Sequence, residues 1–279
     1  MRRRLGKGGT LDWATLKTAA QAKKSFWPPP RHRARACSSP AMEEVLYKGS
    51  SDAAGRPNGQ GLVTFESGDV YEGEWEAGTP HGYGKMRYAD GDVFIGNFAD
   101  GAPYGAGTLI IDGNEYAGDF KNNGKSLVPH GRGIMKYADG NVYSGDFVNG
   151  QRDGVGENKY VYGAVYEGPW AKDERHGMGR LRFPNGTIFE GFWQENERGR
   201  RGTLWLPGGE VQCVLFNADG RPVGDGVMWS ADRRSAWRMR GGKQAEAISI
   251  GEAATVVSTV VSLPIPYRQW WECCSGKPA

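Results

Sequence analysis

Polar and apolar side chains alternate over short stretches of this chain, and glycine-containing turns separate the stretches. In residues 71–75, Tyr-Glu-Gly-Glu-Trp, two aromatic rings and a glycine share one face and two glutamates share the other, because successive strand residues point to opposite faces. Residues 84–88 alternate in the same way. Asp90-Gly91 then marks a turn, since glycine adopts positive φ freely. The pattern predicts a β-hairpin.

This pattern recurs along the chain at spacings of 22 to 27 residues. Most copies open with an aromatic-x-Gly-x-aromatic segment and continue to a Gly-x-Gly pair. The copies begin at Tyr47, Tyr71, Phe94, Tyr116, Tyr143, Tyr166 and Phe189, and a degenerate eighth copy begins at Val211. Consecutive hairpins of this kind predict an all-β fold, a single elongated antiparallel sheet in which each repeat contacts mainly its neighbours.

Over residues 47–232 the repeat resembles the MORN (membrane occupation and recognition nexus) repeat, whose consensus is close to Y-E-G-x-W/F-x-x-G-x-x-H-G-x-G-x-x-x-Y/F-x-D/N-G-x-x-Y. Similar arrays occur in phosphoinositide kinases, SET-type lysine methyltransferases, junctophilins and radial-spoke proteins. In the enzymes among them the array is an accessory module beside a separate catalytic domain. The V-A-I-K, H-R-D and D-F-G elements of a kinase are absent from this sequence. The resemblance therefore implies a non-catalytic protein.

The glycines of the strands need a cause, because glycine weakens a strand. One alternative is that each aromatic ring lies flat over a glycine of a neighbouring strand. The other is that the rings line a concave face that receives a partner helix or a second copy of the chain, since aromatic residues are enriched in protein interfaces. This candidate partner-binding face consists of Tyr71, Trp75, Tyr88, Phe94, Phe98, Tyr116, Phe120, Tyr143, Phe147, Tyr166 and Trp170.

The repeats divide the chain into three parts. Residues 1–42 are basic and interrupted by proline, residues 43–232 hold seven clear copies and the degenerate one, and residues 233–279 form a cap and tail. We expect the first part to be a disordered arm; the alternatives are an organelle transit segment and a true start at Met42. In the last part Ser249 and Glu252 match a capping box, which predicts a short helix that closes the open end of the sheet.

Charge is unevenly distributed within a formal net charge of +3. Residues 1–41 contain ten basic and one acidic residue, residues 43–232 contain 18 basic and 28 acidic residues, and residues 233–279 contain seven basic and three acidic residues. An acidic array is repelled by anionic lipid, so attachment to a membrane would depend on the basic arm and the tail. The same imbalance disfavours nucleic-acid binding by the array.

Residues with potential chemistry are too far apart to act together. His81, His130 and His176 each precede a Gly-x-Gly pair, but alternate repeats would hold them ~20 Å apart, too far to share a zinc ion. The four cysteines lack the spacing of a disulfide framework or a zinc site. The Gly-x-Gly pairs do not continue as phosphate loops. We therefore predict no catalytic, cofactor-binding or metal-binding residues.

The predicted function is that of a non-catalytic scaffold or adaptor for protein–protein interaction, whose partner is another protein or a second copy of the chain. One alternative is peripheral attachment to an anionic, phosphoinositide-containing membrane. Another is a regulatory relative of MORN-containing phosphatidylinositol phosphate kinases that lacks the kinase domain. We expect a cytoplasmic location with membrane or cytoskeletal association, or organelle targeting by residues 1–41. No cofactor and no small-molecule substrate is expected.

Overall fold

The structure is a computed structural model that describes residues 46–122, 127–217 and 220–260. The nineteen strands of these residues belong to one antiparallel sheet, and one short helix follows them, α2 (Ile250–Val260). The prediction of an all-β sheet of repeated hairpins with a short C-terminal helix is confirmed. The predicted N-terminal arm lies outside the described residues.

Contacts along the chain divide the described residues into two compact units. The N-terminal unit contains residues 46–165 and Trp170–Asp173, and the C-terminal unit contains Tyr166–Pro169 and residues 174–260. Strand β11 (Val165–Ala171) contributes residues to both. The boundary falls inside the array of repeats.

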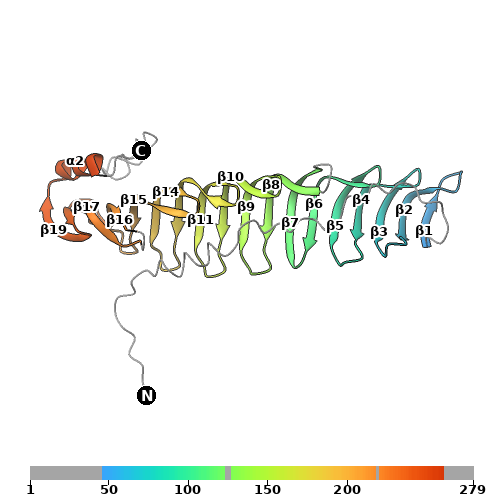
Figure 1. The fold of residues 1–279 in the computed structure, drawn as a ribbon, viewed down its shortest axis with the longest axis horizontal. Coiled ribbons are helices and arrows are strands. Elements are labelled where there is room, and N and C mark those ends of the chain that lie inside the picture. The colour runs from blue at the N-terminus through green and yellow to red at the C-terminus, as the bar shows by residue number, and fades with distance from the viewer. Residues whose placement is uncertain (1–45, 123–126, 218–219, 261–279) are drawn as a thin grey trace, which may run out of the picture. The chain divides into compact units, whose positions relative to one another are not determined.

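In the N-terminal unit each strand pairs antiparallel with the next, and Figure 1 shows them side by side in chain order. The strands are β1 (Leu46–Ser51), β2 (Pro57–Thr64), β3 (Val70–Glu76), β4 (Thr79–Arg87), β5 (Val93–Ala99), β6 (Ala102–Ile111), β7 (Asn114–Asn122), β8 (Leu127–Lys136), β9 (Val142–Val148) and β10 (Gln151–Lys159).

The C-terminal unit continues the same order of antiparallel neighbours. Its strands are β12 (Glu174–Arg175), β13 (Gly177–Arg182), β14 (Ile188–Gln194), β15 (Glu197–Trp205), β16 (Val211–Phe216), β17 (Pro222–Trp229), β18 (Ala236–Arg240) and β19 (Lys243–Ile248). The last two strands extend the sheet beyond the last recognisable repeat. They form a hairpin around Gly241-Gly242, a dipeptide that favours such turns.

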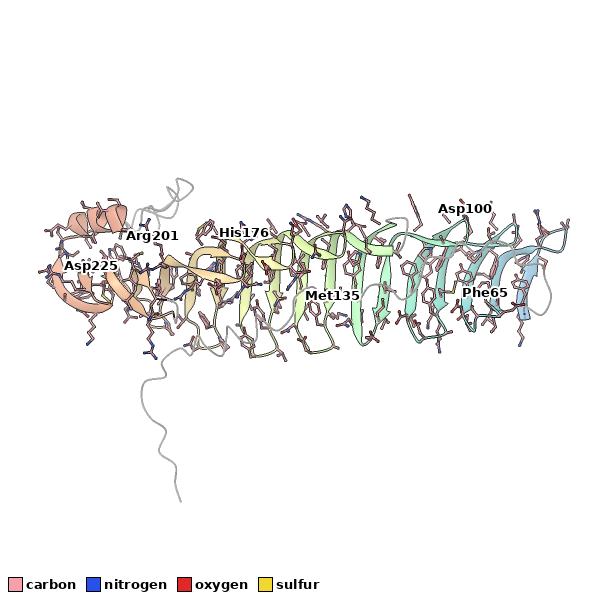
Figure 2. The ribbon with its side chains drawn as sticks, viewed as in Figure 1. Phe65, Asp100, Met135, His176, Arg201 and Asp225 are labelled. Carbon is pink, nitrogen blue, oxygen red and sulfur yellow. The ribbon has the colours of Figure 1, made fainter. Side chains whose placement is uncertain are left out.

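Turns join the strands at two opposite ends, which Phe65 and Asp100 mark in Figure 2. At the Phe65 end the predicted Asp90-Gly91 turn is present: Gly91 has φ +100° and its N–H donates to the Tyr88 carbonyl at 2.9 Å. At the Asp100 end several turns have two residues, such as Asp100 and Gly101 with φ +49° and +77°. Positive φ at both positions is the geometry of a type I′ turn, which matches the twist of the strands.

Side chains also link successive turns at the Phe65 end. The N–H of Ala89 donates to Asp69 at 2.8 Å, that of Ala138 to Asn114 at 3.0 Å, and that of Val161 to Asn141 at 2.9 Å. In each case an aspartate or asparagine of one turn satisfies a backbone donor of the next turn. The hairpins are therefore connected beyond the ladder of the sheet.

The core of the N-terminal unit is made of aromatic rings seated over glycines. Tyr71 is fully buried, and its ring occupies the space above Gly73 and Gly84. A Cβ atom added to Gly84 would lie 2.6 Å from the Cε2 atom of Tyr71, so only glycine fits beneath the ring. The Tyr71 hydroxyl donates to the Glu74 carbonyl at 2.9 Å, which holds the ring flat along the strand. Tyr116 and Tyr143 are held in the same way.

The rings also contact one another edge to face from copy to copy. The centroid of Tyr71 lies 5.3 Å from that of Trp75 and 4.9 Å from that of Phe98, with interplanar angles of 84° and 76°. Such pairs contribute ~0.5–1.5 kcal/mol each beyond the burial of their area. Similar contacts continue through Phe120 and Phe147. The rings of each copy therefore pack on the glycines of the same copy and on the rings of the next copy.

In the C-terminal unit α2 covers an apolar cluster on one face of the sheet. Ala253 and Val257 pack into a buried cluster with Val211, Val227 and Trp229. The predicted capping box is present, because the Glu252 N–H donates to Ser249 Oγ at 3.2 Å and the Ser249 N–H donates to the Glu252 carboxylate at 2.9 Å. The helix packs mainly on the face of β16, β17 and β18.

The predicted position of this helix needs a correction. We expected it to close the open edge of the sheet, but the last strand is β19, whose residues are largely exposed. The helix packs on one face of the sheet instead, because β16–β18 present a cluster of apolar side chains on that face, including Val211 and Cys213. Burial of that apolar area stabilises the helix more than cover of a polar edge would.

Replacement of Gly84 by alanine tests the fit between ring and glycine. We expect Gly84→Ala to lower the free energy of unfolding by about 1–3 kcal/mol, the usual cost of overpacking, because the new methyl group would displace the Tyr71 ring. Lys85→Ala, whose side chain points to the opposite face, should change stability by no more than about 0.5 kcal/mol. Urea unfolding measures both. Equal stability of the two variants would show that the ring is not tightly seated.

A second test uses alkaline pH. Burial raises the pKa of Tyr71 to about 12, and the nearby Glu74 carboxylate adds to the shift. Burial also raises the pKa of Tyr116 and Tyr143. A tyrosine in the unfolded chain ionises at about pH 10. Above that pH the folded chain therefore binds more protons than the unfolded chain, and the free energy of unfolding falls as the pH rises toward 12.

Circular dichroism and phenolate absorbance, recorded together against pH, should therefore show one alkaline transition. The double variant Tyr71→Phe/Tyr116→Phe should move that transition to higher pH, since Phe94 already occupies the equivalent position of another copy. A transition at the same pH in the variant would mean that other groups cause alkaline unfolding.

Candidate functional site

The aromatic residues of the predicted partner-binding face lie in the core of the repeats. Ten of the eleven have exposed fractions of 0–9%, namely Tyr71, Trp75, Phe94, Phe98, Tyr116, Phe120, Tyr143, Phe147, Tyr166 and Trp170. Tyr88 is half-buried in a turn at the Phe65 end. For these ten rings the geometry is that of the first alternative, in which each ring packs on glycines. The ten rings are covered by their own repeats, and the opposite face carries exposed side chains that a partner could contact.

That opposite face, called the open face below, consists of the side chains of β2–β10 that point away from the buried rings. Strand register aligns them in rows, because residues directly opposite each other on neighbouring strands share a face. One central row runs across β4 to β8 through Lys85, Ile95, Thr108, Ala117 and Ile134. Its apolar members are only partly covered, and Ile134 is 45% exposed.

Ion pairs border this row. Lys136 Nζ lies 2.8 Å from Glu115, and Arg132 lies 3.4 Å from Asp146. Asp146 also accepts the N–H of Val155 at 2.9 Å. Exposed pairs of this kind contribute ~0–1 kcal/mol, so they define the surface chemistry more than the stability of the sheet. The open face is thus mainly apolar along its centre from β5 to β8, and mixed in charge at its border.

Two exposed tyrosines stand on the open face near the Asp100 end. Tyr83 of β4 and Tyr104 of β6 are 59% and 68% exposed. Both are register partners of Asn97 on the strand between them, β5. The three side chains therefore form a short row of tyrosine, asparagine and tyrosine. Sequence analysis missed this row because Tyr83 and Tyr104 occupy different positions of the repeat, and only the bulge in the β5–β6 pairing aligns them.

The C-terminal unit has its own exposed ring on the corresponding face. Phe192 of β14 is 44% exposed, and its ring centroid lies 6.4 Å from that of His176. In this unit Pro169 lies opposite an interruption of the partner strand at His176, between β12 and β13. Proline lacks a backbone N–H and cannot donate to the ladder, which is consistent with an interruption at this place. Phe192 resembles the exposed tyrosines in chemistry, and its ring neighbour is His176 rather than an exposed tyrosine.

Near the start of alternate strands, one repeat position carries either proline or arginine. The prolines are Pro57, Pro80, Pro103 and Pro129, and the arginines are Arg152, Arg175 and Arg198. Both residue types accept, through the backbone carbonyl, a hydrogen bond from an N–H in the turn of the next copy. The carbonyl of Pro80 accepts the N–H of Gly101 at 3.0 Å, and that of Arg152 accepts the N–H of Asp173 at 2.9 Å.

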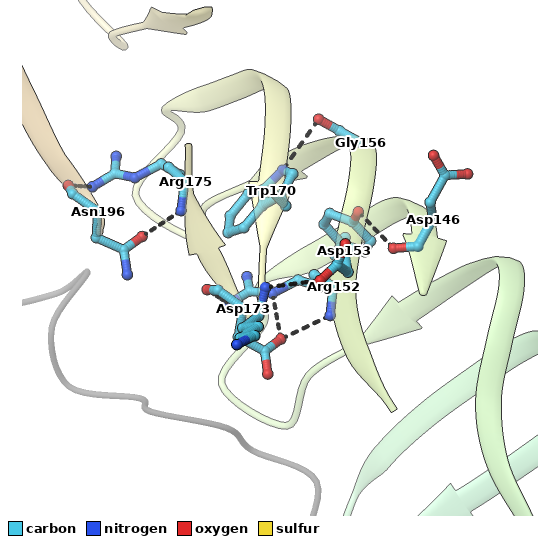
Figure 3. A network of polar contacts seen from close by, with 10 residues as sticks. Asp146, Arg152, Asp153, Gly156, Trp170, Asp173, Arg175 and Asn196 are labelled. Carbon is cyan, nitrogen blue, oxygen red and sulfur yellow. Dashed lines mark hydrogen bonds and ion pairs between the residues drawn. The ribbon is translucent and has the colours of Figure 1, made fainter. Parts of the chain in front are cut away.

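Arginine differs from proline because its backbone N–H also needs a partner. In Figure 3, Asp173 Oδ1 accepts the N–H of Arg152 at 3.0 Å and its Nε at 3.1 Å. The guanidinium also donates to the Asp173 carbonyl at 2.8 Å and lies 4.2 Å from the centroid of the Trp170 ring. A glycine at this turn position suffices beside proline, whereas arginine is accompanied by aspartate.

The C-terminal unit repeats this arrangement with asparagine. The Arg175 N–H donates to Asn196 Oδ1 at 2.9 Å, its guanidinium donates to the Asn196 carbonyl at 2.8 Å and lies 4.1 Å from the Trp193 ring. The guanidinium groups of Arg152 and Arg175 are thus held by internal contacts and by rings, and are not arranged to receive an anionic ligand. The sequence signal was the change from proline to arginine together with glycine to aspartate or asparagine in the following turn.

Groups able to perform chemistry do not converge in the described part of the chain. His81 pairs with Glu76 at 3.3 Å, and the His130 Nδ1 atom accepts the N–H of Asn149, in the turn of the next copy, at 3.5 Å. Among the described residues no three His, Cys, Asp or Glu side chains are placed to hold a metal ion. No helix within residues 46–122, 127–217 and 220–260 is long and apolar enough to cross a membrane.

Comparison with protein families finds the MORN repeat. Its family model matches residues 53–70, 71–93, 128–142, 143–157, 166–188 and 189–211. The unmatched residues between 94 and 127 include Phe94 and Tyr116, which pack on glycines as the matched rings do. None of the curated proteins matches the chain.

Several solved structures share limited similarity with this one. One is the SAS-4 (dCPAP) TCP domain of Drosophila melanogaster in complex with a proline-rich motif of Ana2 (dSTIL), with 12% identity, coverage of 63% of this chain and 94% of that chain, and a TM-score of 0.38. Another is the TCP10 domain of Danio rerio CPAP in complex with a STIL peptide, with 15% identity, coverage of 73% and 99%, and a TM-score of 0.36. TM-scores of this size do not indicate a common overall fold.

The pairing of Arg152 with Asp173 can be tested by conversion to the proline type. We expect Asp173→Gly to lower the free energy of unfolding by about 1–3 kcal/mol, because it leaves the Arg152 N–H and guanidinium with too few acceptors. Adding Arg152→Pro should restore most of this loss, since the double variant recreates the Pro80–Gly101 arrangement. Urea unfolding of the four proteins gives the coupling, which we expect to be about 1–2 kcal/mol. Simple additivity of the two losses would contradict the interpretation.

Proposed function

The chain belongs to the MORN-repeat proteins, and from this premise we propose that it is a non-catalytic scaffold that binds another protein through its open face. The observation that carries the proposal is the row of Tyr83, Asn97 and Tyr104 beside the apolar row that contains Ile134. Tyrosine is among the residues that contribute most to binding at protein interfaces. Large apolar side chains on one exposed face are typical of an interaction surface.

The two faces of the sheet differ in their contacts, and this difference supports the proposed function. On the ring face the ten buried rings pack on glycines, so they stabilise the repeats and are not exposed to a partner. The described side chains of the open face do not take part in these ring–glycine contacts. Its exposed residues are free to differ from copy to copy, and they do: equivalent positions carry Gln60, Tyr83, Arg132 and Val155. A partner could therefore recognise one particular copy of the repeat.

Photo-crosslinking in cells tests the proposal. The full chain would carry a photo-crosslinking amino acid in place of Asn97, or, as a matched control, in place of Tyr162, an exposed residue at the Phe65 end. We expect Asn97 to crosslink to one or a few proteins, and the double variant Tyr83→Ser/Tyr104→Ser to lose these products. The loss should be about tenfold, which corresponds to a joint contribution of about 1.4 kcal/mol from the two interface rings.

Two outcomes would overturn this function. One is the same set of crosslinked proteins from positions 97 and 162, regardless of the tyrosines. The other is flotation of the purified chain with phosphoinositide vesicles at physiological salt, combined with absence of protein crosslinks from position 97. The second outcome would favour attachment to an anionic membrane, because electrostatic attraction to lipid does not depend on the two exposed tyrosines.

A further inference from the structure

The two exposed tyrosines of the open face are spaced like successive turns of a polyproline II helix. Tyr83 and Tyr104 lie on β4 and β6, with one strand between them, and both are register partners of Asn97. Two strand spacings amount to ~9.5 Å. In a polyproline II helix the residues i and i+3 point to the same side, at ~9.3 Å along the axis. An extended proline-rich segment that crosses the strands would therefore place residues i and i+3 on the two rings.

The side chain between the rings suits such a ligand. A polyproline II segment has no internal hydrogen bonds, so its carbonyls need donors from outside. Asn97 is exposed between the tyrosines, and its amide can donate to one of these carbonyls. Aromatic-lined surfaces recognise proline-rich segments because the prolines are already ordered and lose little entropy on binding. Two tyrosines with an amide donor between them fit this mode of recognition.

The charge around this row favours a basic ligand. Strands β3 to β6, residues 70–87 and 93–111, contain the row and hold four acidic residues, Glu72, Glu74, Glu76 and Asp100, against two basic ones, Lys85 and Arg87. All four acidic residues are exposed. Opposite charge near an apolar contact selects the partner and speeds its association. The expected ligand is therefore a run of prolines followed or preceded by basic residues.

The chain itself contains one such segment. Residues 27–35 read Trp-Pro-Pro-Pro-Arg-His-Arg-Ala-Arg, with Trp27 and Pro30 in the i and i+3 positions. These residues lie outside the described part of the structure, and β1 begins at Leu46. The 16 residues from Pro30 to Leu46 can span up to ~50 Å. Four strand spacings separate β1 from β5, or ~19 Å, so the segment can reach the row within one molecule.

We propose that residues 27–35 dock on the row of Tyr83, Asn97 and Tyr104 of the same molecule, with Trp27 and Pro30 against the two rings and the arginines beside Glu74, Glu76 and Asp100. The N-terminal segment then covers the surface proposed for a partner, which has to displace it. This regulatory consequence rests on the proposed function, whereas the intramolecular contact itself does not.

Photo-crosslinking of the purified full chain tests the contact. A photo-crosslinking amino acid would replace His32, and mass spectrometry would locate the products. We expect intramolecular crosslinks to residues of β4–β6. The double variant Tyr83→Ser/Tyr104→Ser should lower their yield about tenfold, as expected for loss of two aromatic contacts, while Tyr162→Ser, a matched exposed tyrosine, should leave it unchanged. Pro29→Ala/Pro30→Ala should also lower the yield, because proline favours the polyproline II conformation that the proposed contact requires.

Three results would overturn the proposal. The first is crosslinks to the acidic turns of the Phe65 end, around Asp69 and Asp90, which would show a contact that depends on charge alone. The second is a yield at β4–β6 that persists without the two tyrosines. The third is crosslinks between two molecules only. The location of the products in the otherwise unaltered chain decides the matter even if the tyrosine variant folds poorly.

The proposed function is tested separately by its crosslinks to other proteins in cells from position 97. If the segment does not dock but those crosslinks are found, the function stands and this inference fails. If both hold, Pro29→Ala/Pro30→Ala should increase the yield of partner crosslinks, because the surface is no longer occupied.

Discussion

The structure depends on the contact between a flat aromatic ring and the missing side chain of glycine. Tyr71 shows the constraint most clearly: its ring fills the space where a Cβ of Gly73 or Gly84 would stand, and its hydroxyl reaches the Glu74 carbonyl. A sheet formed of one layer has little core of its own, so the rings supply one within that layer. Burial of each ring contributes ~1.5–3 kcal/mol, and edge-to-face contacts between copies add to this.

The packing of the rings on glycines has a consequence for function. Because the rings face their own glycines, the aromatic positions that define the repeat are structural, and the residues that vary between copies stand on the open face. Tyr83 and Tyr104 are such residues, as is Phe192 in the C-terminal unit. The repeat therefore separates stability from recognition: one face holds the hairpins together, and the other presents a sequence of side chains specific to this chain. An interaction scaffold needs this separation.

The proline and arginine positions show that a single geometric requirement has two chemical solutions. Each copy must offer a carbonyl to the turn of the next copy, and both Pro80 and Arg152 do so. Proline removes a backbone donor that would otherwise need an acceptor, so glycine suffices in the turn. Arginine keeps the backbone donor and adds a guanidinium. The Asp173 carboxylate accepts hydrogen bonds from both, and the guanidinium lies over the Trp170 ring in a cation–π contact. The two residues of each pair change together within this one chain.

The amino-acid sequence by itself determined the repeat, the hairpin turns such as Asp90-Gly91, the all-β class and the capped helix, because each depends on local periodicity or on the conformational freedom of single residues. Whether Tyr71 and its equivalents face a partner or their own glycines was decided only by the tertiary structure, since alternation assigns a side chain to a face but not its contacts. The row of Tyr83, Asn97 and Tyr104 likewise depends on a bulge in strand pairing. The helix lies on β16–β18 because the apolar cluster there exists only after these three strands have paired.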